Sequence, residues 1–210
     1  ITRNITAGVD GVAVDLMIPA QMGCPHDYAL TPQDMRKLAK ADVLVINGQG
    51  MEEFLGAPLR KANPNLKVID SSQGIGQILQ YRDMEEEPGH RHDAKATNHR
   101  DAHHDEHEQH HAGPNPHLFA SPRMAALLTG TIAKALAERH PQGAAMLTAN
   151  GSDYAERMNR LADDLAALSK RLRNNRIVTQ HGVFDYLARD MGLEVVAVVQ
   201  AHAGQNPSAA

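Results

Sequence analysis

Histidines crowd one stretch of the chain, residues 89–117. Nine of the thirteen histidines lie there, and the first eight sit in a polar run with almost no apolar residues. The ninth, His117, follows Pro114 and Pro116 and precedes an apolar pair, so its backbone is stiffer. Neutral imidazole is the commonest side-chain ligand for zinc and its neighbours. Because histidine is ordinarily a rare residue, we expect a metal-collecting loop that ends at one fixed ligand, rather than a chance accumulation.

Two further histidines stand where a parallel sheet would place ligands. His26 lies in a loop after a predicted strand and directly behind Pro25, and His181 ends another predicted strand. In open α/β sheets, ligands bind beyond the carboxyl ends of the strands. His26, His117 and His181 are therefore the candidate metal ligands, and spacing alone leaves their convergence open.

The same stretch contains a match to a zinc-protease pattern. Residues 107–111 (HEQHH) satisfy H-E-x-x-H, which needs a packed helix to orient its histidines. Here the neighbours are all polar, and Gly113 and Pro114 follow at once. In a run so rich in His and Glu the match is expected by chance, so we set the protease interpretation aside.

Strands and helices alternate along the chain. Apolar and β-branched runs predict strands at residues 11–18, 42–47, 66–70, 176–181 and 193–199. Cap residues and helical spacing predict helices at residues 31–41, 121–139, 141–173 and 182–191. This is the pattern of an α/β fold with parallel sheets. The helix at 141–173, of about 45 Å, is long enough to connect two lobes, and Gly151 is its expected weak point, at a cost of about 1 kcal/mol against Ala.

Composition excludes several classes of protein. A net charge of −4 and a pI near 6.4 argue against nucleic acid as a partner. No apolar run approaches the length of a membrane helix. The single cysteine, Cys24, excludes an internal disulfide and a Cys-based structural zinc site. A final β-α-β piece is too short to bury a core alone, so we expect the second lobe to be truncated in this chain.

Three motifs resemble those of the zinc/manganese solute-binding proteins of ABC importers. They occur in the family's order, at residues 24–48 (CPHDY, LTPQD and LAKADVLVING), 115–122 (NPHLFASP) and 179–186 (TQHGVFDY) with Gly192-Leu193. The histidine-rich loop before the second motif is similar to that of zinc members. Asn115 and Ser121 stand where the family often has Asp, which is expected to weaken the orientation of His117.

The resemblance implies two parallel-sheet lobes joined by a long rigid helix. It assigns residues 1–140 to a metal-binding lobe with its histidine-rich loop at 89–113, 141–173 to the connecting helix, and 174–210 to an incomplete second lobe. His26 and His117 would come from the first lobe and His181 from the second. A fourth ligand would lie beyond residue 210.

The resemblance implies an extracytoplasmic or periplasmic protein that binds zinc and is not an enzyme. It would deliver the divalent metal ion to the membrane permease of an ABC importer, and we expect a monomer. Three imidazoles favour zinc over manganese, whose sites use more carboxylate. Two alternatives stay open: a zinc-dependent hydrolase, for which no general base can be named, and a histidine-rich metal buffer or adhesin on the same scaffold.

Overall fold

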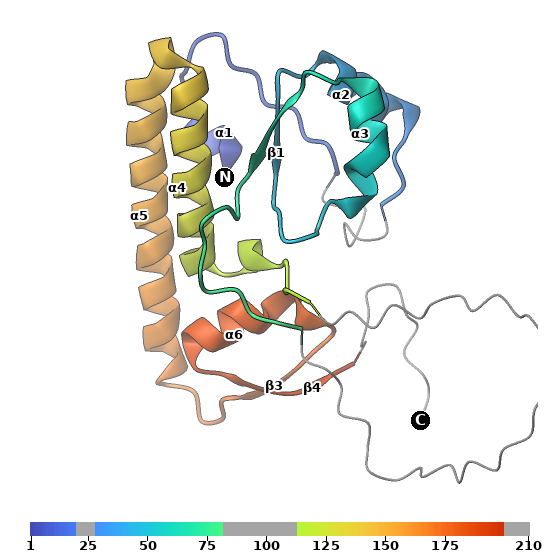
Figure 1. Ribbon diagram of the computed structural model, residues 1–210. Helices are drawn as coiled ribbons and strands as arrows, with labels where there is room; N and C mark the ends of the chain where they lie inside the picture. The colour runs from blue at the N-terminus through green and yellow to red at the C-terminus, as the bar shows by residue number, and fades with distance from the viewer. Residues whose placement is uncertain (20–27, 82–112, 200–210) are drawn as a thin grey trace, which may run out of the picture.

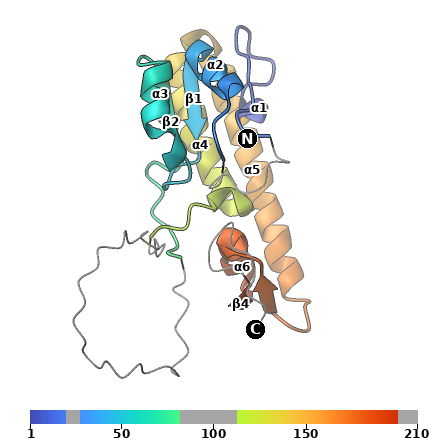
Figure 2. The ribbon, with the colours of Figure 1, turned by 90° about the vertical axis from the view of Figure 1, so that its right-hand side faces the viewer.

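Two small parallel sheets lie at opposite ends of a helical hairpin (Figures 1 and 2). The structure is a computed structural model that describes residues 1–19, 28–81 and 113–199. Its helices and strands are α1 (Thr2–Ile5), α2 (Pro32–Lys40), β1 (Val43–Ile46), α3 (Gly56–Ala62), β2 (Lys67–Asp70), α4 (Pro122–Arg139), α5 (Ala144–Ser169), β3 (Arg176–Thr179), α6 (Asp185–Met191) and β4 (Glu194–Val198). Short 3₁₀ turns occupy Glu53–Leu55, Leu118–Ala120, Pro141–Gly143 and Gly182–Phe184.

The first sheet forms where the sequence predicts it. β1 pairs in parallel with β2, from Val43 opposite Lys67 to Ile46 opposite Asp70. Helix α2 begins as expected, because the Thr31 side chain accepts from the Asp34 backbone N–H while the Asp34 carboxylate accepts from the Thr31 N–H. This reciprocal cap satisfies two of the amides that a helix start leaves without partners.

The second sheet is also parallel and also has two strands in the described residues. β3 pairs with β4, with an irregularity between Ile177 and Val178. Helix α6 connects the two strands and ends at Gly192, which adopts a left-handed conformation. The predicted strand–helix–strand order of this region is confirmed.

Helices α4 and α5 run side by side and link the two sheets (Figure 1). α4 begins at Ser121–Pro122 as predicted, with the Ser121 hydroxyl accepting from the Met124 N–H. α5 has 26 residues and ends at Ser169, four residues earlier than expected. At 1.5 Å per residue it is about 39 Å long.

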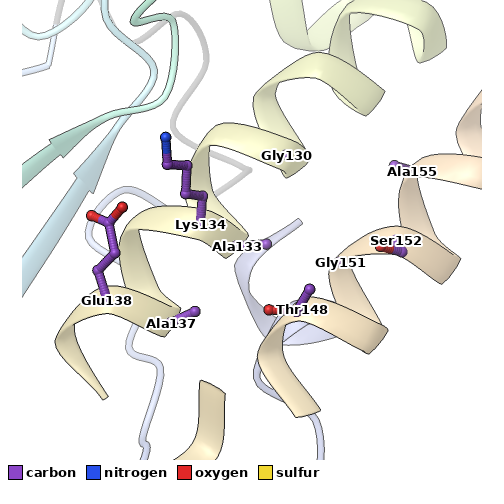
Figure 3. Close-up of a pocket in the computed structure, with 9 residues that line it drawn as sticks. All are labelled: Gly130, Ala133, Lys134, Ala137, Glu138, Thr148, Gly151, Ser152 and Ala155. Atoms are coloured by element: carbon purple, nitrogen blue, oxygen red, sulfur yellow. The ribbon is translucent and has the colours of Figure 1, made fainter. Parts of the chain in front are cut away.

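Gly151 has a packing role that its low helix propensity alone does not predict. It is buried in α5, and a Cβ atom built there would lie 2.5 Å from the Cβ of Ala133 in α4. The surface hollow beside this contact is lined mainly by small residues of both helices (Figure 3). Gly151 is therefore a point of very close approach in the hairpin, and the expectation that it is only a weak point was incomplete.

The expected strand at residues 11–18 is wrong. Among the described residues it has no partner strand. The Leu16 carbonyl instead accepts a hydrogen bond from the Lys37 ammonium at 2.7 Å. A β-branched composition favours extended backbone, but a strand also needs a neighbour to complete its hydrogen bonds.

Two buried clusters hold the described chain together. One packs Ile5 and Val9 against Ile132 and Leu147 of the hairpin. The other contains Leu118 from the 3₁₀ turn before α4, Met124 and Leu128 from α4, and Tyr186 from α6. The second cluster therefore fixes α6 against the segment that carries His117. None of the described helices combines the length and apolarity that crossing a bilayer demands.

Candidate metal centre

His117 lies just before α4, in the part of the chain that follows the first sheet (β1 and β2). It precedes the 3₁₀ turn at Leu118–Ala120, which leads into α4. Its side chain is 1% exposed, so the imidazole is held inside the protein. The proline before it is buried as well, and the Pro116 carbonyl accepts from the side-chain amide of Asn47 at 2.7 Å.

Asn115 sets the orientation of the His117 ring. Its side-chain Oδ1 lies 2.8 Å from His117 Nδ1 and also accepts from the His117 backbone N–H at 3.0 Å. An amide oxygen can only accept, so His117 Nδ1 carries the proton and the Nε2 lone pair is the one a metal can use. Asn115 therefore still orients the ring, and the weaker orientation expected from the Asp-to-Asn departure stays a prediction.

Ser121, the other departure, has a different role. Its hydroxyl caps α4 and donates to the Asp190 carboxylate of α6. It thus connects the start of α4 to the second sheet region rather than orienting His117.

His181 follows β3 and begins the 3₁₀ turn at Gly182–Phe184. Its Nδ1 accepts from the Val183 N–H at 3.2 Å, and that N–H also reaches the His181 carbonyl at 2.8 Å. Burial lowers the pKa of the half-buried His181 ring, and the nearby Asp185 carboxylate partly offsets this. A lowered pKa favours the neutral imidazole that metal binding requires.

The two histidines come together although 64 positions separate them. Their ring centroids lie 5.2 Å apart, with the ring planes tilted by 39°. The rings of Tyr81 and Phe119 stand edge-on to His117 at 6.1 and 6.0 Å. Two imidazoles at this separation can share one zinc ion at the usual bond length of about 2.0–2.1 Å with modest ring adjustment.

The other predicted metal residues fall outside the described residues. His26 and most of the histidine-rich loop at 89–113 are in this position. Within residues 1–19, 28–81 and 113–199, no group of three or more His, Cys, Asp or Glu residues could hold a metal. The ends that flank the loop are nevertheless fixed, because Gln80 and Pro114 form an antiparallel bridge and the Tyr81 N–H donates to the Gly113 carbonyl at 2.9 Å.

The turn after β1 supports the site and was not predicted. Asn47 contacts Pro116 through its amide, while the Glu52 carboxylate accepts from the Asn47 and Gly48 backbone N–H groups at 2.7 and 3.1 Å. Burial raises the pKa of Glu52. Gly48 has a φ of +89°, and a Cβ there would lie 2.0 Å from the Asp70 carboxylate. The available signal was Asn47-Gly48 directly after the apolar strand β1, at its carboxyl end.

Comparison with known proteins places this arrangement in context. The family model described as "Zinc-uptake complex component A periplasmic" matches residues 1–210. The zinc-binding protein AdcA of Streptococcus pyogenes is 27% identical over 207 residues, which are 98% of this chain and 39% of AdcA. The high-affinity zinc uptake system protein ZnuA of Bacillus subtilis is 29% identical over 198 residues, or 94% of this chain and 57% of that protein.

Solved structures are similar in fold as well. A crystal structure of ZnuA superposes with a TM-score of 0.76 at 28% identity, covering 99% of this chain and 69% of that one. FpvC of Pseudomonas aeruginosa, in complex with Ni²⁺, gives a TM-score of 0.72 at 30% identity and covers 99% and 65%. The chain spans less than two thirds of the length of the curated relatives it matches.

Proposed function

Because the chain belongs to the family of periplasmic zinc-uptake component A proteins, we propose that it captures zinc between two α/β lobes and delivers it to the membrane permease of an ABC importer. Members of this family bind metal for uptake and are not enzymes, so the hydrolase alternative gains no support. The proposed location is periplasmic or otherwise extracytoplasmic. We propose that the protein acts as a monomer and has no nucleic-acid partner.

The observation that carries this proposal is the meeting of two imidazoles from different sheet regions. His117 precedes α4, His181 follows β3, and their ring centroids are 5.2 Å apart. A ligand shared by these rings would contact both lobes at once, which is what a solute-binding protein needs in order to signal its loaded state. The proposed lobes are residues 1–140 and 174–210, joined by 141–173.

Zinc is the proposed metal. Imidazole suits zinc, copper and nickel better than it suits manganese, which favours oxygen ligands. FpvC has been crystallised with Ni²⁺ and with Mn²⁺, so the fold itself does not select one metal. We propose His26 as the third ligand, because it stands in the first of the three motifs and its ring would add a third neutral nitrogen.

The histidine-rich loop is proposed to collect zinc for this centre. Tyr81 and Gly113, described residues on either side of its histidines, are hydrogen-bonded to each other. Tyr81 in turn lies edge-on to His117. A metal released from either end of the loop therefore has a short path to the candidate centre.

Calorimetric zinc titration distinguishes this function from a simple metal buffer. We would compare the unmodified chain, a chain lacking residues 90–111, and a His117→Ala/His181→Ala chain at pH 7.5. Deletion of the loop is expected to lower the number of zinc ions bound and to leave one tight site. The double variant is expected to lose the tight site and keep the weak ones. If the loop deletion abolishes tight binding instead, the protein is a metal buffer and the proposed centre is wrong.

A further inference from the structure

Asn115 makes hydrogen bonds from every polar position of its side chain. Oδ1 accepts from the Nδ1 and backbone N–H groups of His117, at 2.8 and 3.0 Å. Nδ2 donates to the Gly182 carbonyl at 2.8 Å and to Asp185 Oδ2 at 3.1 Å. Asn115 is fully buried and Asp185 is 6% exposed, so water cannot substitute easily for any of these partners.

The two ends of this amide belong to different parts of the molecule. His117 is in the segment before α4, whereas Gly182 and Asp185 are in the turn and helix between β3 and β4. Rotating the amide by 180° would set its NH₂ group against the His117 N–H and its oxygen against the Gly182 carbonyl. The acceptors of the second region therefore fix which end of Asn115 faces His117, and with it the nitrogen of His117 that keeps a lone pair.

The backbone of Asn115 is held from the same side. The Tyr186 hydroxyl donates to the Asn115 carbonyl at 2.7 Å and accepts from the Leu79 N–H at 3.1 Å. Tyr186 is fully buried and is the neighbour of Asp185 in α6. Two consecutive residues of α6 thus hydrogen-bond to Asn115: Asp185 to its side chain and Tyr186 to its backbone carbonyl.

An aspartate in place of Asn115 would not suit these surroundings. Both of its oxygens accept only, so one would face the Gly182 carbonyl and the Asp185 carboxylate with no hydrogen between them. Two buried like charges at such a distance repel strongly. Asn115 and Asp185 are complementary as donor and acceptor, and that complementarity is lost if Asn115 also becomes a carboxylate.

We propose that Asn115 and Asp185 form a matched pair through which the second lobe positions a metal ligand of the first lobe. Asp185 is the positioning residue: it holds the Asn115 amide, which in turn presents His117 with Nε2 toward the metal. The metal part of this inference rests on the proposed function, while the orientation of the ring does not.

A double-mutant cycle tests the pair. Zinc affinity would be measured for the unmodified chain and for Asn115→Asp, Asp185→Asn and the double variant. Asn115→Asp is expected to weaken binding about 10- to 100-fold, as is usual for groups that orient a ligand. Asp185→Asn alone should cost less, because its side-chain carbonyl can still accept from Asn115. When Asn115→Asp is already present, the same change should strengthen binding, because the new amide can donate to the new carboxylate.

That reversal of sign is the decisive outcome. A double variant that binds zinc no better than Asn115→Asp overturns the proposal, because independent structural damage would simply add. If Asn115→Asp fails to fold, the same comparison is made by thermal melting, where the double variant must recover the folded state. Failure of both chains to fold also overturns the pair.

A metal-free measurement separates this inference from the proposed function. Two-bond ¹H–¹⁵N correlation spectra report which imidazole nitrogen carries the proton, and the His117→Ala spectrum assigns the His117 signals. We expect the Nδ1–H form in the unmodified chain, and ring signals in the double variant nearer to the unmodified chain than those of Asn115→Asp. The Nε2–H form in the unmodified chain contradicts the positioning role. A chain that passes this test yet binds no zinc contradicts the proposed function alone.

Discussion

His117 and His181 lie side by side, yet their surroundings prepare them differently. His117 is buried, and its Nδ1 faces an oxygen that can only accept. His181 is half-buried, and its Nδ1 already accepts from the Val183 N–H. In the neutral ring, the proton of His181 therefore sits on Nε2, while Nδ1 uses its lone pair to accept from Val183. Neither nitrogen then offers a lone pair to a metal.

In the proposed centre, this difference means that the candidate ligand His117 is already oriented for metal and the candidate ligand His181 must rearrange. His117 can bind through Nε2 without any change in its bonds to Asn115. His181 has to give up its bond to Val183, although the Val183 N–H keeps the His181 carbonyl at 2.8 Å. If the proposed centre binds zinc, His117 would contribute mainly affinity, and the rearrangement of His181 would let the second sheet region respond to the metal.

Removing the preset ligand should produce the largest effect. Changes to groups that only orient a ligand cost about 10- to 100-fold in affinity, so His117→Ala is expected to cost more than about 100-fold. His140→Ala, at the C-terminal end of α4, is the matched control and should leave affinity unchanged. Isothermal titration with zinc at pH 7.5 measures both, and equal losses in the two variants would refute the special role of His117.

Removing the rearranging ligand should cost less. Binding through His181 sacrifices a hydrogen bond worth about 0.5–1.5 kcal/mol, which corresponds to at most about tenfold in affinity. We therefore expect His181→Ala to weaken zinc binding as well. The fold-loss of affinity should be smaller than that of His117→Ala, by a factor of up to about ten. A larger loss for His181→Ala under the same conditions would reverse the comparison.

Acid should separate the contributions of the two rings further. Protons compete with zinc for imidazole, ordinarily near pH 6.5. Because burial lowers the pKa of His181, its ring stays neutral to a lower pH than an exposed histidine. The affinity difference between the unmodified chain and His181→Ala should thus persist at pH 6.5 and shrink by pH 5.5. Disappearance of that difference already at pH 6.5 would contradict the lowered pKa.

Substitutions in the helical hairpin should change the free energy of unfolding but not the difference between His117 and His181 in zinc binding. Gly151→Ala places a Cβ 2.5 Å from Ala133, so we expect about 1–3 kcal/mol of destabilisation from overpacking. Gly130→Ala is the control in the partner helix, where a Cβ meets nothing within 4 Å, and it should stabilise by up to about 1 kcal/mol. Thermal melts give both values. If Gly151→Ala is as stabilising as Gly130→Ala, the close helix contact is wrong.

Local signals in the sequence predicted much of the fold. The cap at Thr31 and Asp34 acts within one helical turn, and the apolar run of β1 needs only burial, so both were recognisable from neighbouring residues. The strand expected at residues 11–18 depended on a distant partner, and composition alone could not supply one.

The site shows the same limit. The motifs predicted His117 and His181 as ligands, and their approach to 5.2 Å agrees with a shared centre. The role of Asn115 could not be predicted, because its amide is held by Gly182 and Asp185, some 67 and 70 positions away. Within its own motif, Asn115 only lacks the charge of the Asp that the family often has there. Its amide donors find their acceptors, Gly182 and Asp185, only in the folded protein.

The central claim, that one zinc ion is held between His117 and His181, is tested most directly by diffraction from zinc-loaded crystals on both sides of the zinc absorption edge. We predict one strong anomalous peak about 2.0–2.1 Å from Nε2 of His117 and from a ring nitrogen of His181, with Asn115 Oδ1 still bonded to His117 Nδ1. A fully occupied zinc peak that contacts neither ring, or that contacts His117 while His181 remains bonded to Val183, would contradict the account.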